Sequence, residues 1–182
     1  MGRLYRGPIK LALFDVDGVL TDGSLHIDGE GERVKTFNVR DGLAISLLRA
    51  HGIRSGILSG KASAALEFRI RQLKFDFSIT GQLEKRDAYF SIKAQQNLQN
   101  DQIVYVGDDV VDLPLAGLVR CFYAPADAHT LVLKNANHIL ATKGGHGVAR
   151  EVAEHILLSD GITLEEMYLP LTDQWNRYDA AQ

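Results

Sequence analysis

The sequence has a single cysteine, few aromatic residues and no long apolar run. Because Cys121 is the only cysteine among 182 residues, an internal disulfide is excluded and a reducing compartment is favoured. No apolar stretch approaches the roughly 20 residues that span a bilayer, and the N-terminus lacks the apolar core of a secretory signal. We therefore expect a cytoplasmic protein without a membrane partner.

Neither sign of charge dominates the sequence. The 20 basic and 23 acidic residues give a net charge of −3, and the basic residues are scattered rather than clustered with aromatic side chains. This distribution argues against a nucleic-acid partner. A chain of this length with 46% apolar residues is typical of one globular unit. We expect a single domain over residues 1–162 and a C-terminal arm or flexible tail over residues 163–182.

Short apolar runs alternate with helical patterns along the chain. This alternation predicts an α/β fold with a doubly wound parallel sheet and right-handed crossovers. Residues 24–39 interrupt it with two apolar segments around a glycine-bearing polar stretch, which predicts a β-hairpin. Asp41 is expected to cap the next helix. The expected strands are 9–14, 53–58, 75–79, 103–106, 119–123 and 138–140, and the main expected helices are 41–51, 62–73, 84–98, 129–134 and 148–158.

Two carboxylates follow the first predicted strand. In open α/β sheets, ligands bind in the crevice beyond the carboxyl ends of the strands, so Asp15 and Asp17 should face a binding site. Gly18 allows a sharp turn that brings both groups around one centre. The alternative is a solvated turn, because Asp and Gly are common turn residues.

Polar residues also end three of the later strands. Because parallel strands bring their carboxyl ends to one edge of a sheet, these residues should converge with Asp15 and Asp17. Carboxylates are the ligands that Mg²⁺ prefers, whereas a hydroxyl, backbone N–H groups and a lysine bind phosphate oxygens. The set predicts Mg²⁺-dependent phosphoryl transfer. The polar residues are Ser59 with Gly60, Lys85 shortly after Gly81, and Asp108 with Asp109.

In the order and spacing of these motifs, the chain resembles the haloacid dehalogenase (HAD) superfamily of aspartate-nucleophile phosphatases. The resemblance covers nearly the whole chain. It implies a Rossmann-like fold and a phosphoric monoester hydrolase that passes through an aspartyl phosphate. Its four motifs are D-x-D-G-V-x-T-D-G at residues 15–23, Ser59-Gly60, Lys85, and G-D-D-x-x-D at residues 107–112.

The resemblance also implies roles for the site residues. Asp15 would be the nucleophile and Asp17 the general acid and base. Mg²⁺ would be held by the Asp15 carboxylate, the backbone carbonyl of Asp17 and the Asp108 carboxylate. Ser59, Gly60 and Lys85 would bind the phosphoryl group. Asp109 and Asp112 would not bind the metal directly but would support the residues that do.

The gaps between the motifs are too short for the cap domain of larger superfamily members. The chain resembles most the capless phosphatases of 3-deoxy-D-manno-octulosonate 8-phosphate (KDO 8-phosphate), which act in lipopolysaccharide precursor synthesis. This resemblance implies a homo-oligomer, expected to be a tetramer, in which the hairpin of one subunit lines the next subunit's site. It is carried by residues 21–23, 38–42, 81–85, 105–109, 126–128 and 144–151.

Two positions depart from the family pattern. Lys61 and His146 stand where the family usually has arginine. Lys61, Arg69 and Arg150 are candidate substrate-binding residues, with solvated surface positions as the alternative. Two other functions remain open, namely a phosphatase of 2-keto-3-deoxynononate 9-phosphate and a non-catalytic receiver-like module.

Overall fold

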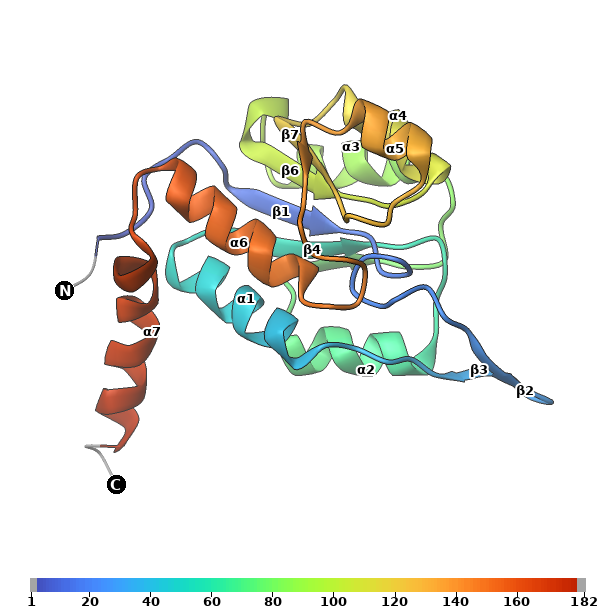
Figure 1. Cartoon of the computed structure of the whole chain (residues 1–182), viewed down its shortest axis with the longest axis horizontal. Coiled ribbons are helices and arrows are strands. Elements are labelled where there is room, and N and C mark those ends of the chain that lie inside the picture. The colour runs from blue at the N-terminus through green and yellow to red at the C-terminus, as the bar shows by residue number, and fades with distance from the viewer. Residues whose placement is uncertain (1–2, 180–182) are drawn as a thin grey trace.

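The computed structural model describes residues 3–179 and contains a six-stranded parallel sheet (Figure 1). The strand order is β5-β4-β1-β6-β7-β8, and every neighbouring pair is parallel. Strand β1 is fully buried, as its run of apolar residues predicts for a strand covered on both faces. The strands are β1 (Leu11–Phe14), β4 (Arg54–Leu58), β5 (Phe77–Ile79), β6 (Ile103–Val106), β7 (Cys121–Ala124) and β8 (His138–Ile139).

Helices cover both faces of the sheet, and a separate apolar cluster fills the space on each side. The doubly wound α/β fold predicted from the sequence is confirmed. Within residues 3–179, no helix combines the length and apolar character needed to cross a bilayer. One face carries α1 (Val39–Ala50), α2 (Ala64–Leu73) and α6 (Val148–Ser159); the other carries α3 (Lys85–Gln95), α4 (Leu113–Ala116) and α5 (Thr130–Asn135), with the 3-10 turns η1 (Asn100–Gln102) and η2 (Val110–Asp112) nearby.

The direction of winding reverses at β1. From β1 the chain proceeds outward through β4 to β5, then returns to the other side of β1 and proceeds through β6 and β7 to β8. The loops after β1 and β6 therefore diverge from one point, which is where open α/β sheets form their binding crevice.

The predicted hairpin is present as a separate two-stranded sheet. Strand β2 (His26–Asp28) pairs antiparallel with β3 (Gly31–Val34), and the hairpin extends away from the main body (Figure 1). Strand β2 nearly matches the first predicted segment, residues 25–27, whereas β3 ends at Val34, where the second predicted segment, residues 34–39, begins. Three apolar side chains of this region, Leu25, Ile27 and Val34, are largely exposed.

The prediction that Asp41 caps α1 is wrong. The N-cap is Asn38, whose side chain accepts a hydrogen bond from the backbone N–H of Arg40. Asp41 lies buried in the first turn, and its Oδ1 accepts a hydrogen bond from the N–H of Ala149 at 2.9 Å. Its partner is 108 residues away, so local sequence signals cannot distinguish this role from a cap.

An arm or flexible tail was expected from residue 163 onward, and residues Leu164–Asp179 form helix α7. Its first half packs against α1 and α6, where Met167 and Leu171 are buried in the core. The ring nitrogen Nε2 of His51 lies 2.8 Å from the carbonyl oxygen of Met167. The first half of α7 is therefore part of the folded body, whereas residues 180–182 of the expected tail lie outside the described residues.

Candidate active site

A cleft of about 340 Å³ opens at the carboxyl ends of β1, β4 and β6. The structure brings together there most of the residues that the sequence predicted for one site. Leu83 and Val111 add an exposed apolar rim. The sequence-predicted residues that line the cleft are Asp15, Asp17, Ser59, Gly60, Lys61, Lys85, Asp108 and Asp109.

Lys85 is the buried cation of this site. Its side chain is only 1% exposed, and Nζ lies 2.7 Å from Asp15 Oδ2 and 2.5 Å from Asp112 Oδ1. Burial lowers the pKa of Lys85, but the charges of Asp15 and Asp112 raise it above its usual value. Lys85 therefore remains an ammonium. It also donates a hydrogen bond to the hydroxyl of Tyr105, which in turn donates to Asp112.

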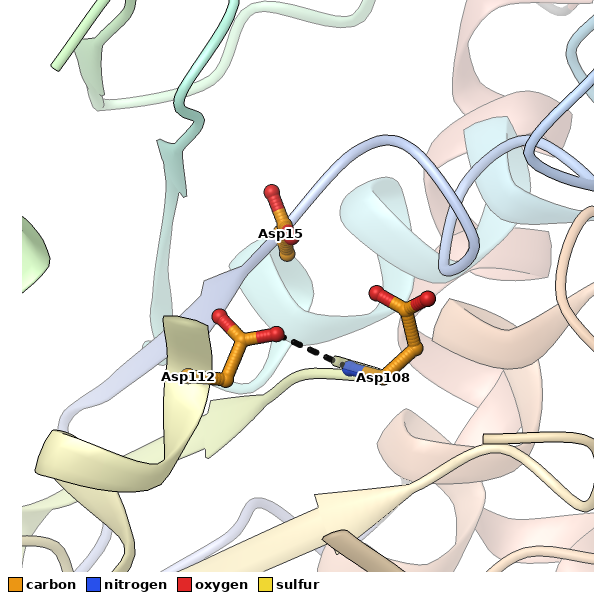
Figure 2. A group of neighbouring side chains, drawn as sticks. All are labelled: Asp15, Asp108 and Asp112. Atoms are coloured by element: carbon orange, nitrogen blue, oxygen red, sulfur yellow. Dashed lines mark hydrogen bonds between the residues drawn. The ribbon is translucent and has the colours of Figure 1, made fainter. Parts of the chain in front are cut away.

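Three carboxylates converge beside Lys85. Oxygens of Asp15, Asp108 and Asp112 all lie within 4.8 Å of one another (Figure 2). Asp112 is already saturated, because Lys85 and Tyr105 occupy Oδ1 and the backbone N–H groups of Asp108 and Asp109 donate to Oδ2. By contrast, the buried Oδ1 of Asp108 has no hydrogen-bond partner among the residues that the structure describes. Asp15 and Asp108 thus retain the available oxygens.

Crowding changes the charge state of these acids. Burial raises the pKa of Asp15 to about 7, an effect that Lys85 opposes and Asp112 reinforces. Burial and the charges of Asp15 and Asp112 raise the pKa of Asp108 to about 8. A divalent cation would offset this repulsion and occupy the free oxygen of Asp108. The residues present therefore fit a Mg²⁺ site.

The turn after β1 requires glycine at position 18. Gly18 has φ of +81°, a value that residues with a side chain rarely adopt. A Cβ at this position would also lie 1.9 Å from Asp108 Oδ2. The loops after β1 and β6 can approach this closely only because residue 18 has no side chain.

Asp17 lines the cleft, but its carboxylate is bound by a lysine of the hairpin region. Oδ1 lies 2.5 Å from the ammonium of Lys35, which follows strand β3 of the hairpin. The Asp17 carboxylate is consequently absent from the cluster of Asp15, Asp108 and Asp112. Of the three predicted metal ligands, Asp15 and Asp108 contribute carboxylates to this cluster. Asp17 was expected to contribute only its backbone carbonyl.

The end of β4 presents polar groups suited to an anion. Ser59 is buried but lines the cleft, and its hydroxyl accepts a hydrogen bond from the backbone N–H of Lys61 at 3.3 Å. Lys61 is exposed at the cleft mouth. Helix α2 begins at Ala64 after the N-cap Ser63, slightly later than predicted.

Two predicted substrate-binding residues do not line the cleft. A guanidinium nitrogen of Arg69 donates to the backbone carbonyl of Asn38 at 3.0 Å. Arg150 contacts Glu154 and Tyr168 near α7. Within the chain, both arginines therefore make contacts that position helices.

Sequence reasoning missed Lys35 and assigned no role to Tyr105. Lys35 lies between Val34 and Phe37 in the second predicted segment of the hairpin, where a lysine is usually solvated. Tyr105 lies in an apolar strand and looks like an ordinary core residue. No local sequence pattern marks either role, because Lys35 contacts Asp17 and Tyr105 contacts Lys85, and both partners are distant in the sequence.

Comparisons with known proteins give a consistent result, although no family model matches the chain. The chain is 43% identical over 153 residues to the 3-deoxy-D-manno-octulosonate 8-phosphate phosphatase KdsC of Haemophilus influenzae, covering 84% of this chain and 85% of that protein. The cobalt-bound structure of the Haemophilus influenzae phosphatase gives a TM-score of 0.82 at 43% identity, covering 85% of this chain and 90% of that chain. The Moraxella catarrhalis phosphatase, solved with a magnesium ion, a phosphate ion and a KDO molecule, gives a TM-score of 0.80 at 32% identity and covers 84% and 87%.

Proposed function

The chain belongs to the KdsC family of phosphatases within the HAD superfamily, and we propose that it hydrolyses KDO 8-phosphate to KDO and phosphate. One observation carries the proposal. The strand-end motifs meet in one cleft, where the Lys85 ammonium lies 2.7 Å from the Asp15 carboxylate. The arrangement provides a nucleophile, a fixed cation to bind phosphoryl oxygens and a second carboxylate to move protons.

In the first step, a carboxylate oxygen of Asp15 attacks phosphorus. A bond forms between that oxygen and phosphorus while the bond from phosphorus to the sugar oxygen breaks, and Asp17 gives its proton to the leaving oxygen. In the second step, water attacks the aspartyl phosphate and Asp17 takes the proton from this water. Inorganic phosphate leaves and the Asp15 carboxylate is restored.

The remaining residues hold the phosphoryl group and the cofactor. Ser59, with the N–H groups near Gly60, would bind phosphoryl oxygens together with Lys85. Asp15, Asp108 and the backbone carbonyl of Asp17 would hold Mg²⁺, which supplies positive charge against the phosphoryl oxygens when bound. Asp112 and Asp109 would keep the turn after β6, which carries Asp108, in position.

The nononate phosphate is a second candidate substrate because of Lys61. The KDO 8-phosphate phosphatases that the chain resembles usually have arginine at this position, and their nononate relatives tend to have glutamate. Lys61 retains the positive charge that favours a substrate carboxylate but lacks the two-pronged geometry of arginine. Both candidate substrates carry this carboxylate, so the charge of Lys61 does not distinguish between them. The similarity to phosphatases of KDO 8-phosphate makes that sugar phosphate the first candidate.

We also propose that the protein is a cytoplasmic homo-oligomer, expected to be a tetramer. The exposed apolar residues of the hairpin region and the apolar rim of the cleft support this proposal, because such surfaces are usually covered by a partner. A groove of about 370 Å³ beside the hairpin adds Phe37, Val39 and Phe68 to the apolar surface.

The direct test measures phosphate release from KDO 8-phosphate and the nononate phosphate, side by side, with and without Mg²⁺. We expect Mg²⁺-dependent turnover that favours KDO 8-phosphate and falls to background in Asp15→Asn. Asp101→Asn, which alters an exposed carboxylate at the amino end of β6, serves as the matched control and should behave as wild type. Absence of turnover on both substrates would refute the proposed function.

A further inference from the structure

The hairpin region contributes a buried cation, Lys35, that contacts Asp17, one of the residues that line the cleft. The side chain of Lys35 is 1% exposed, although the preceding residue, Val34, is 56% exposed. Its Nζ lies 2.5 Å from Asp17 Oδ1 and 2.7 Å from Glu32 Oε1. Burial lowers the pKa of Lys35, but hydrogen bonds to Asp17 and Glu32 raise it above its usual value. A buried ammonium is tolerated only with such partners.

These contacts fix one side of the Asp17 carboxylate. Apart from Lys35, the residues that the structure describes offer Oδ1 only a long hydrogen bond of 3.4 Å from the Thr21 hydroxyl. None of them hydrogen-bonds to Oδ2. The ammonium therefore orients the carboxylate through Oδ1 and leaves Oδ2 available for a proton.

We infer that Lys35 is the positioning residue for proton transfer by Asp17, and that Glu32 holds Lys35 in place. The inference rests on the proposed function, since it takes Asp17 as the proton carrier. Lys35 does not touch the reacting atoms in this account. It keeps Oδ2 of Asp17 aimed at the oxygen that leaves in the first step and at the water that attacks in the second.

The geometry also makes the hairpin part of the catalytic apparatus of its own chain. Lys35 and Glu32 belong to the hairpin region, whereas Asp17 belongs to the loop after β1. A displacement of the hairpin would move the ammonium and release Asp17. A purely structural Lys35 would instead anchor the hairpin without affecting the proton-transfer steps selectively.

Leaving-group chemistry separates these two roles. Departure of a sugar alkoxide needs a proton, whereas p-nitrophenolate leaves without one; hydrolysis of the aspartyl phosphate needs a base with either substrate. For Lys35→Met we expect turnover of KDO 8-phosphate to fall roughly 10- to 100-fold, within the range of general acid–base catalysis. With p-nitrophenyl phosphate, we expect a rapid burst of about one nitrophenolate per site and then slow turnover, because the second step still needs Asp17.

Three further variants complete the experiment. Lys35→Arg keeps the charge and should recover part of the lost activity. Arg33→Met removes an exposed cation that pairs with Glu30 in the same hairpin, and it should leave activity unchanged. In an Asp17→Asn background, Lys35→Met should cost nothing more, because the group that it positions is gone. Thermal melts and light scattering of each variant report folding and assembly.

The outcomes are distinct. Equal loss of the burst and of steady turnover in Lys35→Met, or losses that multiply in the double variant, would assign Lys35 a structural role and overturn the inference. Unchanged activity in Lys35→Met would overturn it as well. Wild-type activity in Asp17→Asn would refute the proposed role of Asp17, and the inference with it, while inactivity of the wild-type protein on both sugar phosphates refutes the proposed function itself.

Discussion

At the scale of single residues, the candidate active site holds three carboxylates so close together that their negative charges repel unless a cation offsets them. The buried Asp15 and the half-buried Asp108 lie near each other and near Asp112, and Lys85 provides one positive charge for the group. One ammonium does not balance three carboxylates. Burial and the neighbouring carboxylates therefore raise the pKa values of Asp15 and Asp108. Because a metal ion binds the deprotonated carboxylates, metal binding should release protons.

The coupling predicts a pH dependence with a definite sign. With folded-state pKa values of about 7 and about 8, Asp15 and Asp108 hold protons that the unfolded chain has already lost above pH ~4. The stability of the metal-free protein should therefore fall as the pH rises from about 5 to 8. Mg²⁺ affinity should rise over about pH 6 to 8, by roughly tenfold per pH unit for each proton released.

Titration calorimetry in buffers of different ionisation enthalpy counts these protons, and thermal melts with chelator or with Mg²⁺ give the stability. We expect one to two protons to be released near neutral pH. Mg²⁺ affinity that stays constant between pH 6 and 8 would contradict the account.

The sequence predicted the residues whose place follows from topology. Asp15 and Ser59 directly follow strands and Asp108 lies two residues after β6, and parallel strands bring those ends together. It could not predict that Asp112 is saturated by Lys85, Tyr105 and two backbone groups, or that Lys35 reaches Asp17. Those facts depend on side-chain packing between segments that are separated in the chain, which no local pattern encodes.

At the scale of secondary-structure elements, strands and most helices were predictable because their apolar periodicity is strong. The ends of the elements were less predictable. Helix α1 begins with the cap Asn38 because Asp41 is used in a long-range contact to α6. The sequence did not predict that α7 joins the folded body, because its apolar pattern is short and Pro170 interrupts it. Burial of Met167 and Leu171 against other helices stabilises its first half.

The hairpin exposes apolar side chains, and we propose that another subunit covers them. Ile27 is 67% exposed, and we expect Ile27→Asp to weaken assembly because a charge would be buried at the interface. Light scattering should show a shift from the oligomer towards smaller species, with at least a tenfold loss of activity. The matched control is Leu158→Asp, which places the same charge on an exposed apolar position of α6. A fully active wild-type monomer would contradict the proposed assembly.

At the scale of the whole molecule, the reversal of winding at β1 determines where the cleft of the candidate active site lies. Asp15 follows β1 and Asp108 follows β6, so both lie at this point of the sheet edge, and β4 contributes Ser59 from the neighbouring strand. The hairpin extends from the body, and α7 lies at the opposite end of the molecule (Figure 1). No cap domain covers the cleft within residues 3–179.

In the proposed mechanism, Asp15 carries the phosphoryl group between substrate and water. Rapid quenching of Asp17→Asn with p-nitrophenyl phosphate and Mg²⁺, followed by intact-mass and peptide mass spectrometry, tests it most directly. One phosphoryl group should accumulate on Asp15, because p-nitrophenolate leaves without a proton while hydrolysis of the intermediate lacks its base. Asp15→Asn should show no adduct. A phosphoryl group on another residue, or wild-type turnover by Asp15→Asn, would contradict the account.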